Sequence, residues 1–331
     1  MKRSLLTQIA YRNILWLFGL LLLLIPAIRD MFFIQDPGIP LFKFLIDAGI
    51  FGSQISPTFQ SAIFIRVIRL LLLFGCALFL QFISSEYRLI RVRSFFPFSL
   101  FCILSATILP VLSLNGTSFS CFFFCWACFR LFAATETTST NHAVFDASFL
   151  LGMASLFQSK LLYLLPVVWI ALGIMQTLNF KSFLSSLLGS IGVFWIIGGI
   201  SFLFQDYNFL LTFSNDLISF SFIDLTTFSP AEIIYISFLI ILMISAMVSF
   251  WLKQNLDKLR TRNYLNSLLL LWFALFALWL FSGNDMGYLL LLFCVSSLME
   301  AYFFSLIDTR YSRFMFIMLL LLSITVYSLF L

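Results

Sequence analysis

The stretch Leu268 to Phe281, which reads LLLLWFALFALWLF, decides the fold of this chain. It is an unbroken apolar run, and it lacks the alternation of polar and apolar residues that a transmembrane β-strand requires. Apolar residues make up 62% of the 331-residue chain and charged residues 10%, with a mean hydropathy of +1.08. Water-soluble proteins carry about 25% charged residues. The sequence therefore predicts an all-α, polytopic transmembrane protein that forms one membrane domain over residues 1–331.

Further apolar runs give the number of spans, since each helix that crosses a bilayer needs about 20 apolar residues. We count eleven, within a range of about 10 to 12, at residues 10–28, 63–82, 95–112, 118–134, 146–158, 161–178, 182–204, 231–252, 264–281, 288–306 and 314–331. The shortest is 146–158. We predict a broken or tilted helix there that reaches the outer side near Lys160.

Lys and Arg gather in alternate connections between these segments, and cytoplasmic loops retain positive charge. The inner group comprises Lys2, Arg3, Arg12, Arg88, Arg91, Arg93, Arg130, Lys181, Lys253, Lys258, Arg260, Arg262, Arg310 and Arg313. The outer group comprises Arg29, Lys43, Arg66, Arg69 and Lys160. This bias predicts a bacterial inner-membrane protein with a cytoplasmic amino terminus and a periplasmic carboxyl terminus. We interpret the net charge of +5 as a topology signal and expect no nucleic-acid partner.

The longest polar stretches are residues 29–62, 135–145 and 205–230, which we predict to be connecting loops. The first of them is too apolar for a simple tether. Its segment 41–51 (LFKFLIDAGIF) has the pattern of a helix that lies flat at the membrane interface. We therefore predict that loop 29–62 is a structured cap on the outer face.

Charged side chains near the outer face are candidates for function, because a charge in or near a membrane is costly. Asp30 and Asp36 follow the first span, where a carboxylate can act as a general base. Arg66 and Arg69 lie on one helical face and can clamp a lipid phosphate, and Lys160 can bind a phosphate at a helix break. The alternatives are a solvated loop for the acids, snorkelling to headgroups for the arginines and a simple turn for the lysine.

Three intramembrane polar residues stand nearer the inner side or within a span. Arg130 and Asp146 are predicted either to form a structural ion pair or, in the case of Asp146, to join Glu300 in a proton or ion path. With a single His and few carboxylates, the sequence indicates no metal centre and no cofactor. A divalent cation is not excluded, but nothing in the residue pattern points to one.

The chain has six cysteines, all within apolar segments. Cys121, Cys125 and Cys128 recur at intervals close to whole helical turns, so they share a face. Because that segment lacks His and carboxylate partners, we interpret these thiols as small buried residues in preference to redox or metal ligands.

Two resemblances rest on one stretch. Phe145-Asp146-Ala147 is followed by SFLLGMASLFQSKLLYLLPVVWIAL up to Leu172, and then by a basic turn at Lys181. This pattern resembles an uncharacterised family of polytopic inner-membrane proteins of Bacteroidetes-type bacteria. It is also similar in topology to the middle of the GT-C membrane glycosyltransferases, which take sugars from polyprenyl-phosphate donors at the outer leaflet.

The GT-C resemblance implies that Asp30 or Asp36 is the base and that Lys160 is the lysine at the helix break. The chain departs from that family because it has no paired Asp-Glu motif after the first span and no large outer carboxy-terminal domain.

Three functions follow from the sequence. The first is an enzyme of envelope biogenesis that transfers a sugar from a lipid-linked donor, with a membrane lipid such as polyprenyl phosphate as its partner. The second is a non-catalytic subunit or scaffold that binds an envelope protein. The third is a transporter that uses Glu300 and Asp146; the low glycine content ranks it last, because helices that slide past one another favour small residues.

Overall fold

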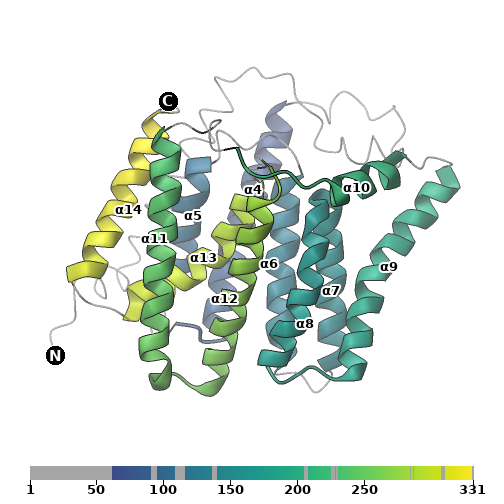
Figure 1. Cartoon of the computed structure of the whole chain (residues 1–331), viewed down its shortest axis with the longest axis horizontal. Coiled ribbons are helices and arrows are strands. Elements are labelled where there is room, and N and C mark those ends of the chain that lie inside the picture. The colour runs from purple at the N-terminus through teal and green to yellow at the C-terminus, as the bar shows by residue number, and fades with distance from the viewer. Residues whose placement is uncertain are drawn as a thin grey trace.

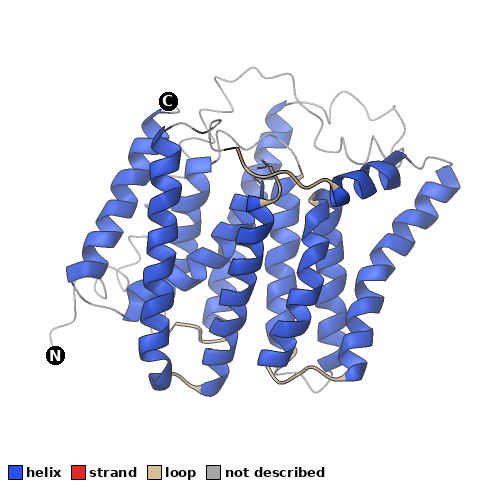
Figure 2. Cartoon of the chain, viewed as in Figure 1, coloured by secondary structure: helices blue, strands red, loops and turns tan. Residues whose placement is uncertain are grey.

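The computed structural model describes residues 62–90, 95–108, 116–135, 140–204, 208–224, 228, 230–283, 285, 287–306 and 310–329. Helices dominate this part of the chain (Figure 2), and its only β-type contact is an isolated bridge between Ser221 and Ser282. The predicted all-α class is therefore confirmed for the described residues. The first predicted span and the interfacial helix 41–51 lie outside them.

The described part contains α-helices and two short 3-10 helices (η2 and η4), labelled in Figure 1 where there is room. In chain order they are α4 (Ala62–Glu86), α5 (Phe96–Ile108), α6 (Thr117–Ala133), α7 (Thr140–Phe157), η2 (Ser159–Tyr163), α8 (Leu164–Ile174), α9 (Phe180–Phe204), α10 (Asn208–Ile218), α11 (Pro230–Lys253), η4 (Gln254–Leu256), α12 (Leu259–Leu280), α13 (Gly287–Leu306) and α14 (Arg310–Leu329). Among the described helices, α4, α9, α11, α12 and α13 are long and apolar enough to cross a membrane. The chain is therefore a helical membrane protein, while the count of eleven spans and the GT-C topology stay predictions.

Helix α13 forms the core of one half of the bundle. It runs obliquely to its neighbours (Figure 1) and packs mainly against α12, α5 and α11, with smaller contacts to α6, α4 and α14. The most apolar window of this helix is entirely buried within the protein. Large side chains such as Phe293, Tyr302 and Phe303 fill the space around it. Helix α13 is thus buried among its neighbours.

The other half of the bundle is built around α7, which packs most extensively against α9 and α6. Gly189 permits the close approach of α9 to α7, because a Cβ atom at this position would lie 2.5 Å from the carbonyl oxygen of Phe145. The opposite face of α9 is open, with Trp195 80% exposed and Leu203 78% exposed. In a membrane protein such an apolar face meets lipid, which is as apolar as leucine.

Basic residues predicted to be cytoplasmic gather at one end of the bundle. Lys181 follows the α8–α9 connection, and Lys253 and Lys258 flank the α11–α12 connection; both connections lie at the same end (Figure 1). Lys160, in η2, lies at the opposite end beside the last turn of α12. This arrangement agrees with the predicted alternation of charge. Which end faces the cytoplasm stays a prediction.

Two predicted boundaries are wrong. The segment predicted as a short, broken helix at 146–158 belongs to α7, which begins at Thr140 and is 18 residues long, so part of the predicted loop 135–145 is helical. An unbroken helix of that length extends about 27 Å, and the break comes after Phe157, at η2. The predicted loop 205–230 contains α10, which lies across one end of the bundle (Figure 1).

Candidate functional site

Glu300 is the most unusual polar residue in the described core. Its side chain is fully buried, and neither carboxyl oxygen has a hydrogen-bond partner among the described residues. An ionised carboxylate is expensive inside a membrane, and a buried polar group without a partner costs about 1–3 kcal/mol. Glu300 therefore does not serve stability. Such a residue within a membrane is by default a functional-site candidate.

A groove between α11 and α12 contains Glu300. These two helices make little direct contact with each other, and each packs on α13 instead. The opening between them, which we call the α11–α12 groove, is narrow: its cavity volume is about 20 Å³, room for one or two water molecules. Its lining is mostly apolar and comes from all three helices, with Ile236 and Ile240 on the α11 wall and Ser296 and Glu300 on the α13 floor. Because the two isoleucines are only half-buried, the groove opens sideways.

Two tryptophans of α12 place hydrogen-bond donors in the same groove. Trp272 and Trp279 line it, and the Nε1 atom of each is buried without a partner in the described part of the chain. Buried indole N–H groups usually find an acceptor. The groove thus combines an apolar lining with two free donors and one carboxyl group. That combination fits an amphiphile with a hydrocarbon chain and acceptor oxygens.

Lys160, predicted to bind a lipid phosphate, is 6% exposed. Its Nζ atom donates a hydrogen bond to the carbonyl oxygen of Phe281, at 3.2 Å, and lies 5.5 Å from the ring centre of Phe220. Burial lowers the pKa of the Lys160 ammonium, and the negative charges of Asp285 and Asp216 act in the opposite direction. These carboxylates already supply the countercharge that a phosphate would bring.

Asp285 ties this lysine site to the start of α13. Its Oδ1 accepts a hydrogen bond from the N–H of Gly287 at 2.9 Å, and its Oδ2 accepts one from Nε2 of Gln158 at 3.5 Å. Position 287 favours glycine, because a Cβ atom there would lie 1.8 Å from that Nε2 atom. Burial raises the pKa of the Asp285 carboxyl, while the Gly287 N–H and Lys160 act against the shift. This cluster joins η2 to the α12–α13 connection, at the end of α12 that carries Trp279.

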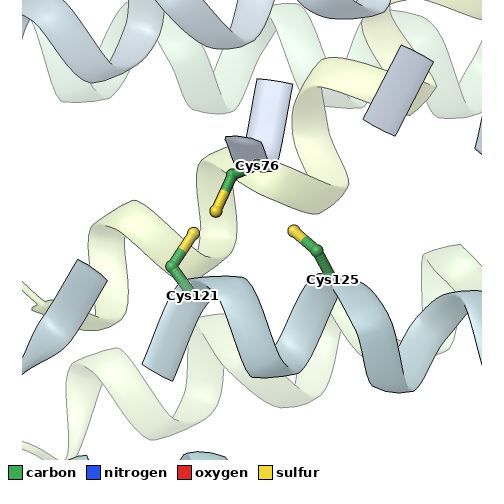
Figure 3. Close-up of side chains that lie close together, drawn as sticks. All are labelled: Cys76, Cys121 and Cys125. Atoms are coloured by element: carbon green, nitrogen blue, oxygen red, sulfur yellow. The ribbon is translucent and has the colours of Figure 1, made fainter. Parts of the chain in front are cut away.

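Four thiols form a second cluster within the bundle core, and Figure 3 shows three of them. Cys76 comes from α4, and Cys121 and Cys125 come from α6; their three sulfur atoms lie within 4.8 Å of one another. The Sγ atom of Cys294, from α13, lies 3.1 Å from that of Cys121. All four side chains are at most 1% exposed. The predicted grouping of Cys121, Cys125 and Cys128 on one face of α6 is thus replaced by a cluster from three helices, which lacks Cys128.

Of the remaining predicted residues, Arg130 and Asp146 form an ion pair between α6 and α7. Arg69 is buried in α4 and makes an interaction there. The side chain of Arg66, together with Asp30 and Asp36, lies outside the described residues. The structure therefore leaves the convergence of the outer acids and cations on one pocket as a prediction.

Sequence reasoning singled out Glu300 but missed its surroundings. Trp272 and Trp279 are seven residues apart, which is about two helical turns. This spacing predicts that both tryptophans lie on one face of α12. Nothing in the sequence placed that face against α13. Comparison of this chain with protein-family models, with curated proteins and with solved structures finds no match.

Proposed function

We propose that this chain is a multi-spanning protein of the bacterial inner membrane that binds a membrane lipid in the α11–α12 groove. The observation that carries the proposal is Glu300, a buried carboxyl group that has no partner among the described residues and lies in a groove that opens sideways. From Leu289 to Glu300 the floor of the groove extends roughly 16 Å along α13. A segment of an acyl or prenyl chain matches that length and enters when the side chains of α11 and α12 move apart, because the free volume of the groove is about 20 Å³.

The hydrogen-bonding groups of the groove define the kind of lipid. The N–H groups of Trp272 and Trp279 donate, and Glu300 in its neutral form, which costs less in a membrane than the carboxylate, donates as well. A pure hydrocarbon would leave all three without acceptors, at about 1–3 kcal/mol each. The ligand is therefore a lipid with ester or phosphate-ester oxygens.

The resemblance to GT-C glycosyltransferases supplies the finer form of this proposal, in which the lipid is a polyprenyl-phosphate-linked sugar used in envelope biogenesis. Asp30 or Asp36 takes the proton of the acceptor hydroxyl. The acceptor oxygen then bonds to the anomeric carbon, and the bond from that carbon to the phosphate oxygen breaks. Arg66 and Arg69 hold the departing phosphate.

In that form, Lys160 contributes to phosphate binding only if the phosphate displaces its present countercharges, Asp285 and Asp216. The fit of Lys160 to a phosphate is therefore weaker than the fit of the groove to a lipid chain.

Lipid retention tests the binding step. We expect native mass spectrometry of the full chain, purified in mild detergent, to show one co-purified lipid per molecule. Trp272→Phe keeps a ring but removes the N–H, and we expect it to weaken retention about tenfold, the equivalent of one hydrogen bond. Trp195→Phe, on the open face of α9, is the matched control and should leave retention unchanged. A wild-type chain free of lipid would overturn the proposal.

A double substitution tests the transfer step separately. Asp30→Asn combined with Asp36→Asn should abolish glycan transfer in cells while the amount of protein in the membrane stays normal. Unchanged envelope glycans in this variant would remove the transferase form and leave lipid binding standing.

Glu300 also favours a second function, proton-coupled transport, because buried carboxyl groups within membranes form proton relays. Asp146 is already paired with Arg130, so Glu300 alone carries this alternative. In proteoliposomes, proton movement that Glu300→Gln abolishes would support transport. Proteoliposomes with the wild-type chain that pass no protons would exclude it.

A further inference from the structure

We propose that Cys76, Cys121, Cys125 and Cys294 bind one thiophilic d10 metal ion, Zn²⁺ or Cu⁺, inside the helical bundle. The site comes from three helices that are far apart in sequence, since Cys121 and Cys294 alone are separated by 173 positions. Four of the six cysteines of the chain meet there. Figure 3 shows three of these side chains, Cys76, Cys121 and Cys125, pointing toward one another.

The distances between the sulfur atoms match such an ion. In a tetrahedral site with zinc–sulfur bonds of about 2.3 Å, the sulfur atoms lie about 3.8 Å apart. The sulfur atoms of Cys76, Cys121 and Cys125 lie within 4.8 Å of one another, and the Cys121–Cys294 pair is 3.1 Å apart. Three sulfur atoms therefore lie within about 1 Å of the ideal spacing, while Cys294 approaches Cys121 but does not lie within 4.8 Å of all three. The site closes when the Cys294 sulfur moves toward Cys76 and Cys125.

The donor set decides the class of metal. Thiols and thiolates select Zn²⁺ and Cu⁺, whereas Mg²⁺ and Ca²⁺ require oxygen ligands. Cysteine ligates these ions as the thiolate, so each coordinating cysteine releases one proton. Four thiolates on Zn²⁺ leave a net charge of about −2 and two thiolates on Cu⁺ about −1. Because a net charge inside a membrane is costly, Cu⁺ held by two thiolates carries the smaller cost.

The other two cysteines show what ordinary packing looks like in this chain. Cys102 is buried on α5. Cys128 lies on the same face of α6 as Cys121 but lines a different pocket, with Phe124 and Leu131. These two residues are therefore matched controls: each is a buried thiol on a helix of the same bundle, outside the set of four.

Metal content tests the site. The full chain is purified in detergent under reducing conditions, stripped with a chelator and titrated anaerobically, in separate arms, with Zn²⁺ and with Cu⁺. We expect the wild type and Cys102→Ser to bind one ion per chain in at least one of the two titrations. The titration in which binding occurs identifies the ion that the site prefers. Cys121→Ser and Cys125→Ser should lower the content to below about one tenth of an ion, because each removes a ligand.

Stability provides the second readout, since a ligand that binds only the folded state raises the denaturation temperature. The metal should raise this temperature for the wild type and for Cys128→Ser but not for Cys121→Ser, which separates loss of the site from loss of the fold. The proposal is overturned if neither ion binds the wild type, or if Cys102→Ser loses metal as fully as Cys121→Ser. It is also overturned if the mass of the isolated chain is two units below that of the reduced chain because a disulfide joins Cys121 and Cys294.

Discussion

Helices α13 and α9 have nearly the same mean hydropathy, 1.6 and 1.9 in their most apolar windows, and opposite surroundings. The window of α13 is 100% buried within the protein and that of α9 is 28% buried. Polar chemistry follows this difference: α13 carries Cys294, Ser296 and Glu300, whereas the open face of α9 carries residues such as Trp195 and Leu203. Hydropathy alone therefore does not identify the helix that holds a site. The neighbours of the helix do.

The contact between α7 and α9 provides the largest expected effect. Gly189→Leu places a side chain where a Cβ atom would lie 2.5 Å from a backbone carbonyl oxygen, and backbone cannot yield as a flexible side chain does. We expect a loss of stability above the about 1–3 kcal/mol typical of overpacking, measured as loss of folded monomer in detergent. Gly199→Leu, with nothing within 4 Å of its Cβ position, should change stability little. Equal losses would show that α9 lacks an open face.

Truncation of leucines compares α13 with α9 directly. Leu291 on α13 is 0% exposed and Leu188 on α9 is 56% exposed. Leu291→Ala leaves a cavity and should cost about 2–5 kcal/mol, whereas Leu188→Ala should cost less than about 0.5 kcal/mol. Unfolding in mixed micelles with increasing denaturing detergent measures both. Similar values for the two variants would contradict the described packing of α13.

Replacement of Glu300 separates function from stability. Glu300→Leu removes a buried group that has no partner in the described part of the chain. It should stabilise the lipid-free chain by about 1–3 kcal/mol and weaken lipid retention. Glu300→Gln keeps a buried amide without a partner, so it should show no such gain. A marked destabilisation by Glu300→Leu would mean that the carboxyl group supports the fold.

The ion pair between Arg130 and Asp146 should have the smallest effect. Its side chains are 31% and 42% exposed, and exposed ion pairs contribute about 0.2–1 kcal/mol. A double-mutant cycle with Arg130→Ala and Asp146→Ala, repeated at high salt, measures the coupling. A coupling above about 2 kcal/mol that resists salt would place the pair in a drier environment than described.

The helices themselves could be predicted closely where an apolar run ends at charged or polar residues. The predicted spans 182–204, 231–252 and 288–306 differ by at most two residues from α9, α11 and α13. Prediction fails where polar residues begin a helix. Helix α7 starts in the polar stretch after residue 139, and α12 starts at Leu259, among basic residues, because helix formation near an interface does not require apolar side chains.

The candidate sites were less predictable than the helices, because each site depends on which helix faces pack against one another. Helical periodicity placed Cys121, Cys125 and Cys128 together, and the structure clusters only the first two, with Cys76 and Cys294 from other helices. Those partners come from segments far away in the chain, and no local pattern encodes their approach.

Labelling with a photoactivatable lipid in native membranes tests the central contrast most directly. On α13, we expect label only at the groove-lining positions Leu289, Leu292, Phe293, Ser296 and Glu300, and on α9 along the exposed face that includes Leu188 and Trp195. Label at Leu290, Leu298 or Ala301, which are buried and do not line the groove, would contradict the account.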